Sequence, residues 1–193
     1  WGSSWLAIHF QLGEVAPEAS IAYRFILASG LLVIWCRLRG ISLRIALHHH
    51  PFLVLLGLSQ FSLNYLLFYY AAFELATGLL AVIFSTITVM NIFNSALFLR
   101  RQIQKKTVLA VVFGLTGMAL VFWPEITTSG HQVATAIGIS LIATYLASIG
   151  NIVSARNQNH GLPVASANAI GMAYGALFML AYSAGSGVPF MID

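Results

Sequence analysis

The sequence contains few charged residues. Asp, Glu, Lys and Arg together make up 7% of its 193 residues, whereas hydrophobic residues make up 59%. Because soluble domains carry about 25% charged residues, this composition excludes an ordinary soluble domain and predicts a polytopic membrane protein. A single cysteine, Cys36, excludes an intrachain disulfide and a cysteine pair for a metal. The net charge of +4 does not indicate nucleic-acid binding, since no basic surface interleaved with aromatic residues lies outside the apolar segments.

Other absences exclude classes of function. There is no GxxxxGK[ST] loop for ATP, so any transport must use a gradient or downhill flow. No lysine follows Lys106, which excludes a retinal-type photosensor with a Schiff base in its last segment. A membrane-embedded enzyme would need His, Asp or Glu clustered at one depth, and only His9 is available. His48–His50 could bind a metal, but they lie on a basic link and are interpreted as interfacial. From these observations together we expect no enzyme activity, no cofactor and no metal.

Apolar runs divide the chain into seven segments. In order they are Trp1–Leu12, Pro17 to about Trp35, Pro51 to about Phe73, Thr77–Leu99, Thr107–Trp123, about Gln132–Ala155, and a last one that Pro163 opens. Thr77–Leu99 is long enough to cross a hydrocarbon core of about 30 Å, and Thr107–Trp123 is just long enough. Trp1–Leu12 is too short to span and is interpreted as the outer half of a cut helix.

The charges predict an orientation. Eight of the nine Lys and Arg residues lie in or beside the links after segments two, four and six, and all five acids lie in the other links or at segment ends. By the positive-inside rule the cationic links are cytoplasmic, and alternation places the N-terminus in the cytoplasm as well.

A faint internal repeat is visible. Pro17-Glu18-Ala19-Ser20 and Pro163-Val164-Ala165-Ser166 each open a helix after a short link. If segment six is a second copy of segment one, the repeat unit has five helices. An odd number of helices inserts its second copy upside down, as in many secondary transporters.

Several motifs occur along the chain, namely Trp1-Gly2-Ser3-Ser4, Pro17 followed by Arg24-Phe25, Tyr69-Tyr70-Ala71-Ala72, the run Thr77–Ser85, Leu97-Phe98-Leu99 and Gly114-Leu115-Thr116-Gly117. Together they resemble the motifs of the drug/metabolite transporter superfamily, specifically EamA-type permeases. The resemblance implies an all-α integral membrane bundle of ten helices in two inverted five-helix repeats. Residues 1–125 would be the first repeat, and residues 132–193 would begin the second.

The sequence departs from that family pattern in two places. The fourth helix of the family often carries a proline where this chain has Ser85-Thr86-Ile87-Thr88-Val89, which puts a kink there in doubt. The family often has Gly-Glu after Phe-Leu, where this chain has Arg100-Arg101. Either difference could alter gating.

Polar residues at membrane depth must face protein or a water-filled cavity, because hydrocarbon offers no hydrogen bonds. Three segments carry polar stripes at helical spacing, namely Gln60 and Asn64; Thr88, Asn91 and Ser95, with Asn94 on the flank; and Ser140, Thr144, Ser148 and Asn151. The serines and threonines are also explained as helix-packing contacts of about 0.6 kcal/mol each. The substrate-cavity candidates are Trp5, His9, Gln60, Asn64, Thr88, Asn91, Ser95 and Asn151.

Two further residues have alternative interpretations. Arg24, the only formal charge well inside a segment, is a candidate either for binding an anionic group or for anchoring its helix. His9 could carry a proton, although a lone membrane histidine is more often a packing residue. Gly171 and Gly175 form a GxxxG pattern that predicts a close helix–helix approach.

These observations favour a secondary transporter of the inner membrane. It would move an amino acid, nucleoside or drug-like solute by alternating access, with the substrate near the midplane between the repeats. The alternative is a scaffold, assembly or sensor protein built on the same bundle without transport. The expected partners are a small-molecule substrate and the lipid bilayer. A homodimer is one of the expected oligomeric states.

Overall fold

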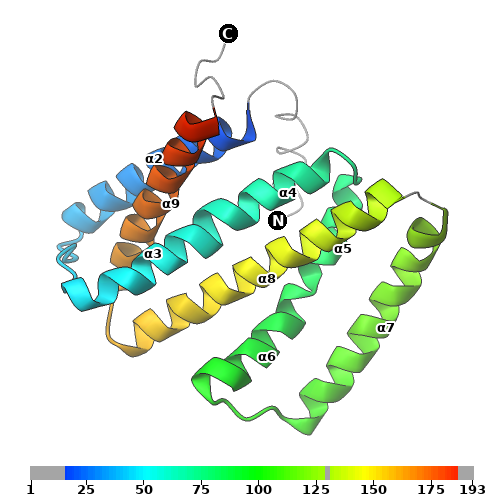
Figure 1. Ribbon diagram of the computed structural model, residues 1–193. Helices are drawn as coiled ribbons and strands as arrows, with labels where there is room; N and C mark the ends of the chain where they lie inside the picture. The colour runs from blue at the N-terminus through cyan, green and yellow to red at the C-terminus, as the bar shows by residue number, and fades with distance from the viewer. Residues whose placement is uncertain (1–15, 129–130, 187–193) are drawn as a thin grey trace.

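The computed structural model describes residues 16–128 and 131–186, and these ranges contain helices and no strands (Figure 1). In chain order the elements are α2 (Pro17–Leu38), the 3-10 turn η1 (Leu47–His49), α3 (His50–Leu58), the π-helical η2 (Ser59–Leu63), α4 (Asn64–Ala72), α5 (Thr77–Ser85), α6 (Ile87–Leu99), α7 (Lys105–Thr128), α8 (His131–Asn159) and α9 (Val164–Ser186).

Five helical stretches in the described part are long and apolar enough to cross a membrane. They are Pro17–Leu38, Leu47–Ala72, Thr77–Leu99, Gln132–Asn159 and Val164–Ser186, and they match the expected segments two, three, four, six and seven. The fifth expected segment lies within α7, a 24-residue helix that is not among the five, and Trp1–Leu12 lies outside the described residues. An all-helical, multi-pass architecture is confirmed, whereas seven spans and a ten-helix inverted repeat stay predictions.

The connections alternate between the two ends of the bundle. The α2–α3, α6–α7 and α8–α9 connections lie along the lower left of Figure 1, and the α4–α5 and α7–α8 connections lie at the opposite side. The first three connections and the helix ends beside them carry every Lys and Arg of the chain except Arg24. We call this side the basic end.

Two helices reach the basic end with a glycine stop. Gly40 follows α2 with a φ of +65°, and Gly161 follows α8 with a φ of +78°, a conformation that glycine adopts without steric cost. The stop at Gly161 explains why α8 continues to Asn159, beyond the predicted end near Ala155. At the end of α6 the same left-handed conformation falls on Arg100, with a φ of +53°.

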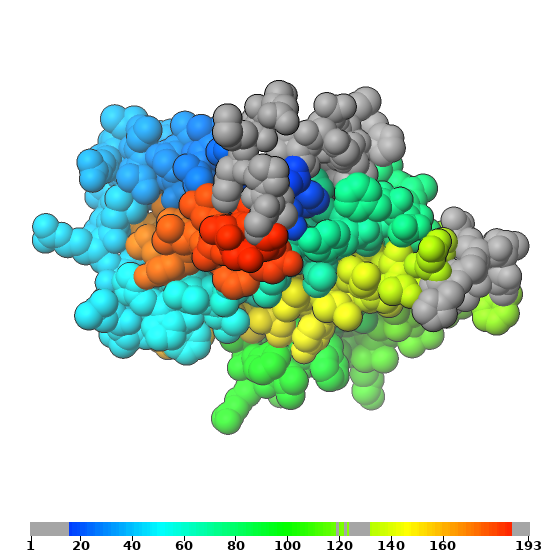
Figure 2. Space-filling model, turned by 45° about the horizontal axis from the view of Figure 1, so that its top comes forward, coloured from blue at the N-terminus to red at the C-terminus, as the bar shows by residue number. Residues whose placement is uncertain are grey.

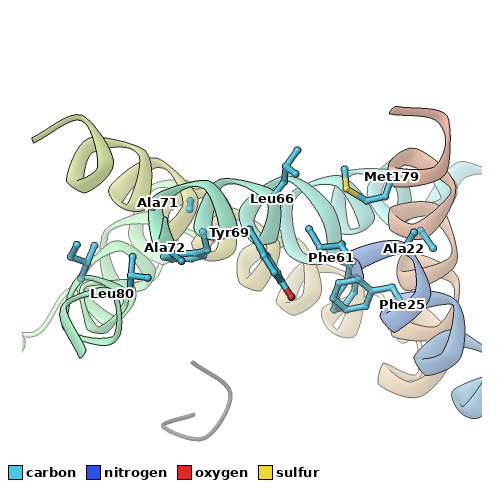
Figure 3. Packing of buried hydrophobic residues seen from close by; sticks show 14 of the residues in the cluster. Ala22, Phe25, Phe61, Leu66, Tyr69, Ala71, Ala72, Leu80 and Met179 are labelled. Atoms are coloured by element: carbon cyan, nitrogen blue, oxygen red, sulfur yellow. The ribbon is translucent and has the colours of Figure 1, made fainter. Parts of the chain in front are cut away.

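The span α3–η2–α4, which corresponds to the third expected segment, forms the centre of the structure. Helices α9 and α2 pack on one side of it and α8 packs on another (Figure 1). The buried apolar side chains run along this span. Figure 3 shows Phe25 of α2 and Met179 of α9 beside Phe61 of η2, with Tyr69 in the following helix α4.

Glycines allow α3 and α9 to cross closely. A Cβ atom on Gly57 would lie 2.6 Å from the carbonyl oxygen of Gly171, and one on Gly175 would lie 2.9 Å from the carbonyl oxygen of Gly57. Both separations are too short for any side chain, so the close approach predicted from the GxxxG pattern is confirmed, with α3 as the partner. At the basic end of the same interface His50 Nδ1 lies 2.6 Å from the Tyr174 hydroxyl.

The span Thr77–Leu99, which corresponds to the fourth expected segment, is interrupted although it contains no proline. Helix α5 ends at Ser85 and α6 begins at Ile87, with Thr86 in a turn between them. The Ser85 hydroxyl donates to the Val82 carbonyl at 2.6 Å, and the Thr86 hydroxyl donates to the Ile83 carbonyl at 2.7 Å. Such back-bonds compete with the helical ladder and bend helices. The helix is therefore interrupted for one residue, at the place where the absence of proline left a kink in doubt.

Helix α7 is the most weakly packed of the described helices. It makes only sparse contacts with α8, and the α6–α7 hairpin projects beyond the body formed by the other helices (Figure 2). Its large apolar residues are mostly exposed, among them Leu109, Phe113 and Leu120 at 63%, 71% and 71%. The hairpin therefore leaves a groove along one side of α6.

Candidate functional site

Two side-chain hydrogen bonds join α6 to α8. The Asn94 amide nitrogen donates to the Ser148 hydroxyl at 2.9 Å, and both residues are fully buried. The Asn151 amide nitrogen donates to Asn91 Oδ1 at 3.4 Å, in a half-buried position. On each helix the two residues are three apart, so both polar positions lie on one face. We call these four residues the α6–α8 seam.

A polar groove lies beside the seam, between α6 and the start of α7. Its volume is about 460 Å³, and its walls come from one face of α6, the α6–α7 link and the first turn of α7. The lining residues are Thr88, Asn91, Ile92, Ser95, Arg101, Gln102, Ile103, Gln104 and Thr107. They provide hydroxyls, amides and one guanidinium, with no acidic side chain among them. We call this the α6–α7 groove.

A smaller hollow of about 200 Å³ continues the groove toward the opposite end of the bundle. It shares Thr88, Ile92 and Thr107 with the larger part and extends along α7 to Met118. The lining becomes more apolar in this direction. The groove therefore offers hydrogen-bonding groups near the basic end and an apolar surface deeper along the helices.

Gln60 and Asn64 lie on the other side of α8, in and after the π-helical turn η2. The Ser62 hydroxyl donates to the carbonyls of Gly57 and Leu58 at 3.0 and 2.9 Å within this widened turn. Gln60 packs directly against Gly150 of α8. Gln60 Oε1 and Asn64 Oδ1 are buried and have no hydrogen-bond partner among the described residues. Unpaired buried acceptors are costly, and π-helical turns often occur at functional sites.

The predicted cavity residues are thus only partly brought together. Thr88, Asn91 and Ser95 line one groove, and Asn151 joins them through its bond to Asn91. Gln60 reaches the same stretch of α8 from η2, but it contacts Gly150 rather than the groove, and Asn64 is buried beside it. Trp5 and His9 lie outside the described residues. Helix α8 is the element that these polar groups share.

Arg24 contacts α4 rather than the groove. Its Nη2 atom lies 3.4 Å from the Tyr69 hydroxyl, and its guanidinium lies 5.7 Å from the centre of the Tyr65 ring. The hydroxyl of Ser20 lies 3.3 Å from the hydroxyl of Tyr69, which is fully buried. Arg24 is half-buried, and its contacts with these aromatic rings join α2 to α4. It is separate from the α6–α8 seam.

Sequence reasoning overlooked a buried carboxylate. Glu18, in the first turn of α2, is 4% exposed and accepts a hydrogen bond of 2.6 Å from the Tyr70 hydroxyl. The sequence placed this residue only among the acids at links and segment ends. Its partner is 52 residues away in the chain, so no local pattern could have identified the contact. The seam residues Asn94 and Ser148 were noted only as parts of polar stripes, without their pairing.

Comparisons with known proteins agree with this architecture. The model of the EamA-like transporter family matches residues 1–123. Protein PagO of Salmonella typhimurium strain LT2 is 25% identical over 129 residues, which cover 67% of this chain. The chain spans less than half of that relative, since the aligned part is 42% of its length. No solved structure matches the chain.

Proposed function

This chain belongs to the EamA-like transporter family, and on that premise we propose that it is a secondary carrier that moves a small organic solute by alternating access. The observation that carries the proposal is the polar α6–α7 groove, which lies beside the α6–α8 seam. Its hydroxyl and amide groups can donate and accept hydrogen bonds, as an amino acid, nucleoside or drug-like solute requires.

The packing of α2 and α9 supports an inverted repeat. These helices carry the two matching sequence motifs, they run antiparallel, and they make the most extensive helix–helix contact in the described part (Figure 1). Two copies of one unit with opposite topology would place their second helices in this relation. In transporters of this kind the solute site lies near the midplane at the repeat interface, often where helices are interrupted. The break at Thr86 and the π-turn η2 are two such interruptions.

The distribution of Lys and Arg supports the expected orientation. We place the basic end in the cytoplasm and the carrier in an inner membrane, with a cytoplasmic N-terminus. A non-transporting scaffold or sensor on the same bundle is the second candidate function. The unpaired oxygens of Gln60 and Asn64 favour transport over this alternative, because a purely structural core usually satisfies its buried amides.

The test is solute counterflow with the complete protein purified into liposomes, using panels of labelled amino acids and nucleosides. At least one solute should exchange, and Asn91→Ala should weaken its apparent affinity about fivefold, as expected for one lost hydrogen bond. Asn168→Ala, which changes a half-buried amide on α9 outside the groove, is the matched control. If no solute exchanges, the scaffold function is favoured. If the two variants behave alike, the groove is not the solute site.

A further inference from the structure

A second groove lies at the basic end, between α3, α6 and α8. It has a volume of about 540 Å³, within the range of about 300–1,000 Å³ that is typical of ligand pockets. Its walls are apolar and include Leu55 of α3, Phe98 of α6 and Ile149 of α8. It shares no lining residue with the α6–α7 groove and lies on another side of α6. We call it the α3–α6–α8 groove.

The polar groups of this groove are confined to one end. Arg156 and Asn159 from the last turn of α8, with His160 directly after it, form the rim at the basic end. No acidic side chain lines the groove. The imidazole of His49 lies near the same rim, with its ring centre 6.0 Å from that of His160. The groove is therefore amphipathic along its length, with an apolar body and a cationic mouth.

Arg156 is held in place at this mouth without an acidic partner. Its guanidinium carbon lies 3.2 Å from the centre of the Phe52 ring, and its Nη1 atom donates to Asn157 Oδ1 at 3.3 Å. No salt bridge to Arg156 occurs within residues 16–128 and 131–186. Stacking fixes the plane of the guanidinium and leaves donors available for a planar or tetrahedral anion.

We propose that the α3–α6–α8 groove binds an anionic phospholipid, with an acyl chain along Leu55, Phe98 and Ile149 and the headgroup phosphate at Arg156 and His160. Basic pockets between membrane helices on the cytoplasmic side are a known way of holding such headgroups. The apolar body matches a hydrocarbon chain, and the absence of acids around the mouth matches a negative headgroup. The lipid would fill the space between α3, α6 and α8, and so would add to the contacts that hold α6 to the body.

The test measures lipid binding, so its outcome is independent of whether the protein transports a solute. The complete protein, stripped of lipid in a neutral detergent, is titrated with phosphatidylglycerol or with phosphatidylcholine of the same acyl chains, and bound lipid is counted by native mass spectrometry. We expect one site that prefers phosphatidylglycerol. Equal binding of the two lipids would overturn the proposal.

Two pairs of variants locate the site. Arg156→Gln should weaken phosphatidylglycerol binding about fivefold, the effect of one basic residue near an anionic headgroup. The matched control is Arg39→Gln. The guanidinium carbon of Arg39 also lies over an aromatic ring, 4.6 Å from the centre of the Trp35 ring, but Arg39 is outside the groove. Equal losses in the two variants would indicate a general attraction to the basic end and would contradict the site.

The second pair tests the apolar body. Leu55 lines the groove and is 41% exposed, so Leu55→Trp fills the space without disturbing the core, and it should abolish the preferred site. Leu97→Trp adds the same bulk at a 60% exposed position outside the groove and should bind lipid as the original protein does. Circular dichroism of each variant verifies folding. Unchanged lipid binding in a folded Leu55→Trp protein would overturn the proposal, because the lipid would then be bound outside this groove.

Discussion

The side-chain nitrogen of Asn94 lies 2.9 Å from the hydroxyl oxygen of Ser148, and neither residue exposes any surface. This bond joins the fourth and sixth segments of the chain across 54 residues. Together with the Asn91–Asn151 contact it fixes which face of α6 is turned to α8. With this face of α6 turned to α8, Asn91 and Ser95 lie at the border of the interface and line the α6–α7 groove.

Removal of the Ser148 hydroxyl should destabilise the protein. Ser148→Ala leaves the buried Asn94 amide without its partner, at a cost of about 0.6 kcal/mol in unfolding free energy and up to about 1.7 kcal/mol. Ser140→Ala on the same helix is the control, because that hydroxyl bonds only to its own helix, at the Ala136 carbonyl. Reversible unfolding in mixed micelles measures both. Equal losses would mean that the Asn94–Ser148 bond contributes nothing specific.

The glycine crossing between α3 and α9 should not tolerate a methyl group. Gly57→Ala places a Cβ atom 2.6 Å from the Gly171 carbonyl oxygen, which forces the two helix backbones apart. We expect a loss of about 1–3 kcal/mol in unfolding free energy, as for other overpacked sites. Gly117→Ala on α7, where nothing lies within 4 Å of the new Cβ, should be neutral or slightly stabilising. A neutral Gly57→Ala variant would show that the crossing is looser than described.

The sequence predicted those features that are set by local patterns. Hydropathy and charge indicated the helical spans, and the spacing of Gly171 and Gly175 indicated a close crossing. It could not predict partners distant in the chain, such as Glu18 with Tyr70 or Gln60 with Gly150, because periodicity shows which face of a helix is polar and not which helix it meets. The absence of proline near Thr86 left a kink there in doubt, because the sequence does not show whether hydroxyl back-bonds interrupt the helix instead.

Arg100 should be replaceable by glycine with a gain in stability. Its φ of +53° costs an L-residue about 1–2 kcal/mol, and glycine avoids that cost while losing about 0.5–1 kcal/mol through its more flexible unfolded state. Arg100→Gly should therefore raise the free energy of unfolding by up to about 1.5 kcal/mol. Arg100→Gln removes the charge but keeps the Cβ atom, and it should show no gain. If both variants gain the same stability over the original protein, charge rather than backbone conformation governs this position.

The pairing of Glu18 with Tyr70 should show the cost of leaving a buried carboxyl group unpartnered. Tyr70→Phe removes the hydroxyl that lies 2.6 Å from Glu18 Oε1, and Glu18 is only 4% exposed. A loss of about 1–3 kcal/mol in unfolding free energy is expected, because the carboxyl group stays buried without its donor. Tyr145→Phe, at a 42% exposed tyrosine of α8, should cost little.

A second substitution at this pair distinguishes an unpaired carboxyl group from lost packing. When Glu18→Leu is added to Tyr70→Phe, both polar partners are gone, and much of the lost stability should return. If the hydroxyl contributed only packing, the second substitution would not restore stability and the two effects would add. Recovery in the double variant would show that the first turn of α2 is fixed to α4 by a polar contact inside the bundle. That contact would then hold α2 in register against both α4 and α9, the two helices between which it packs.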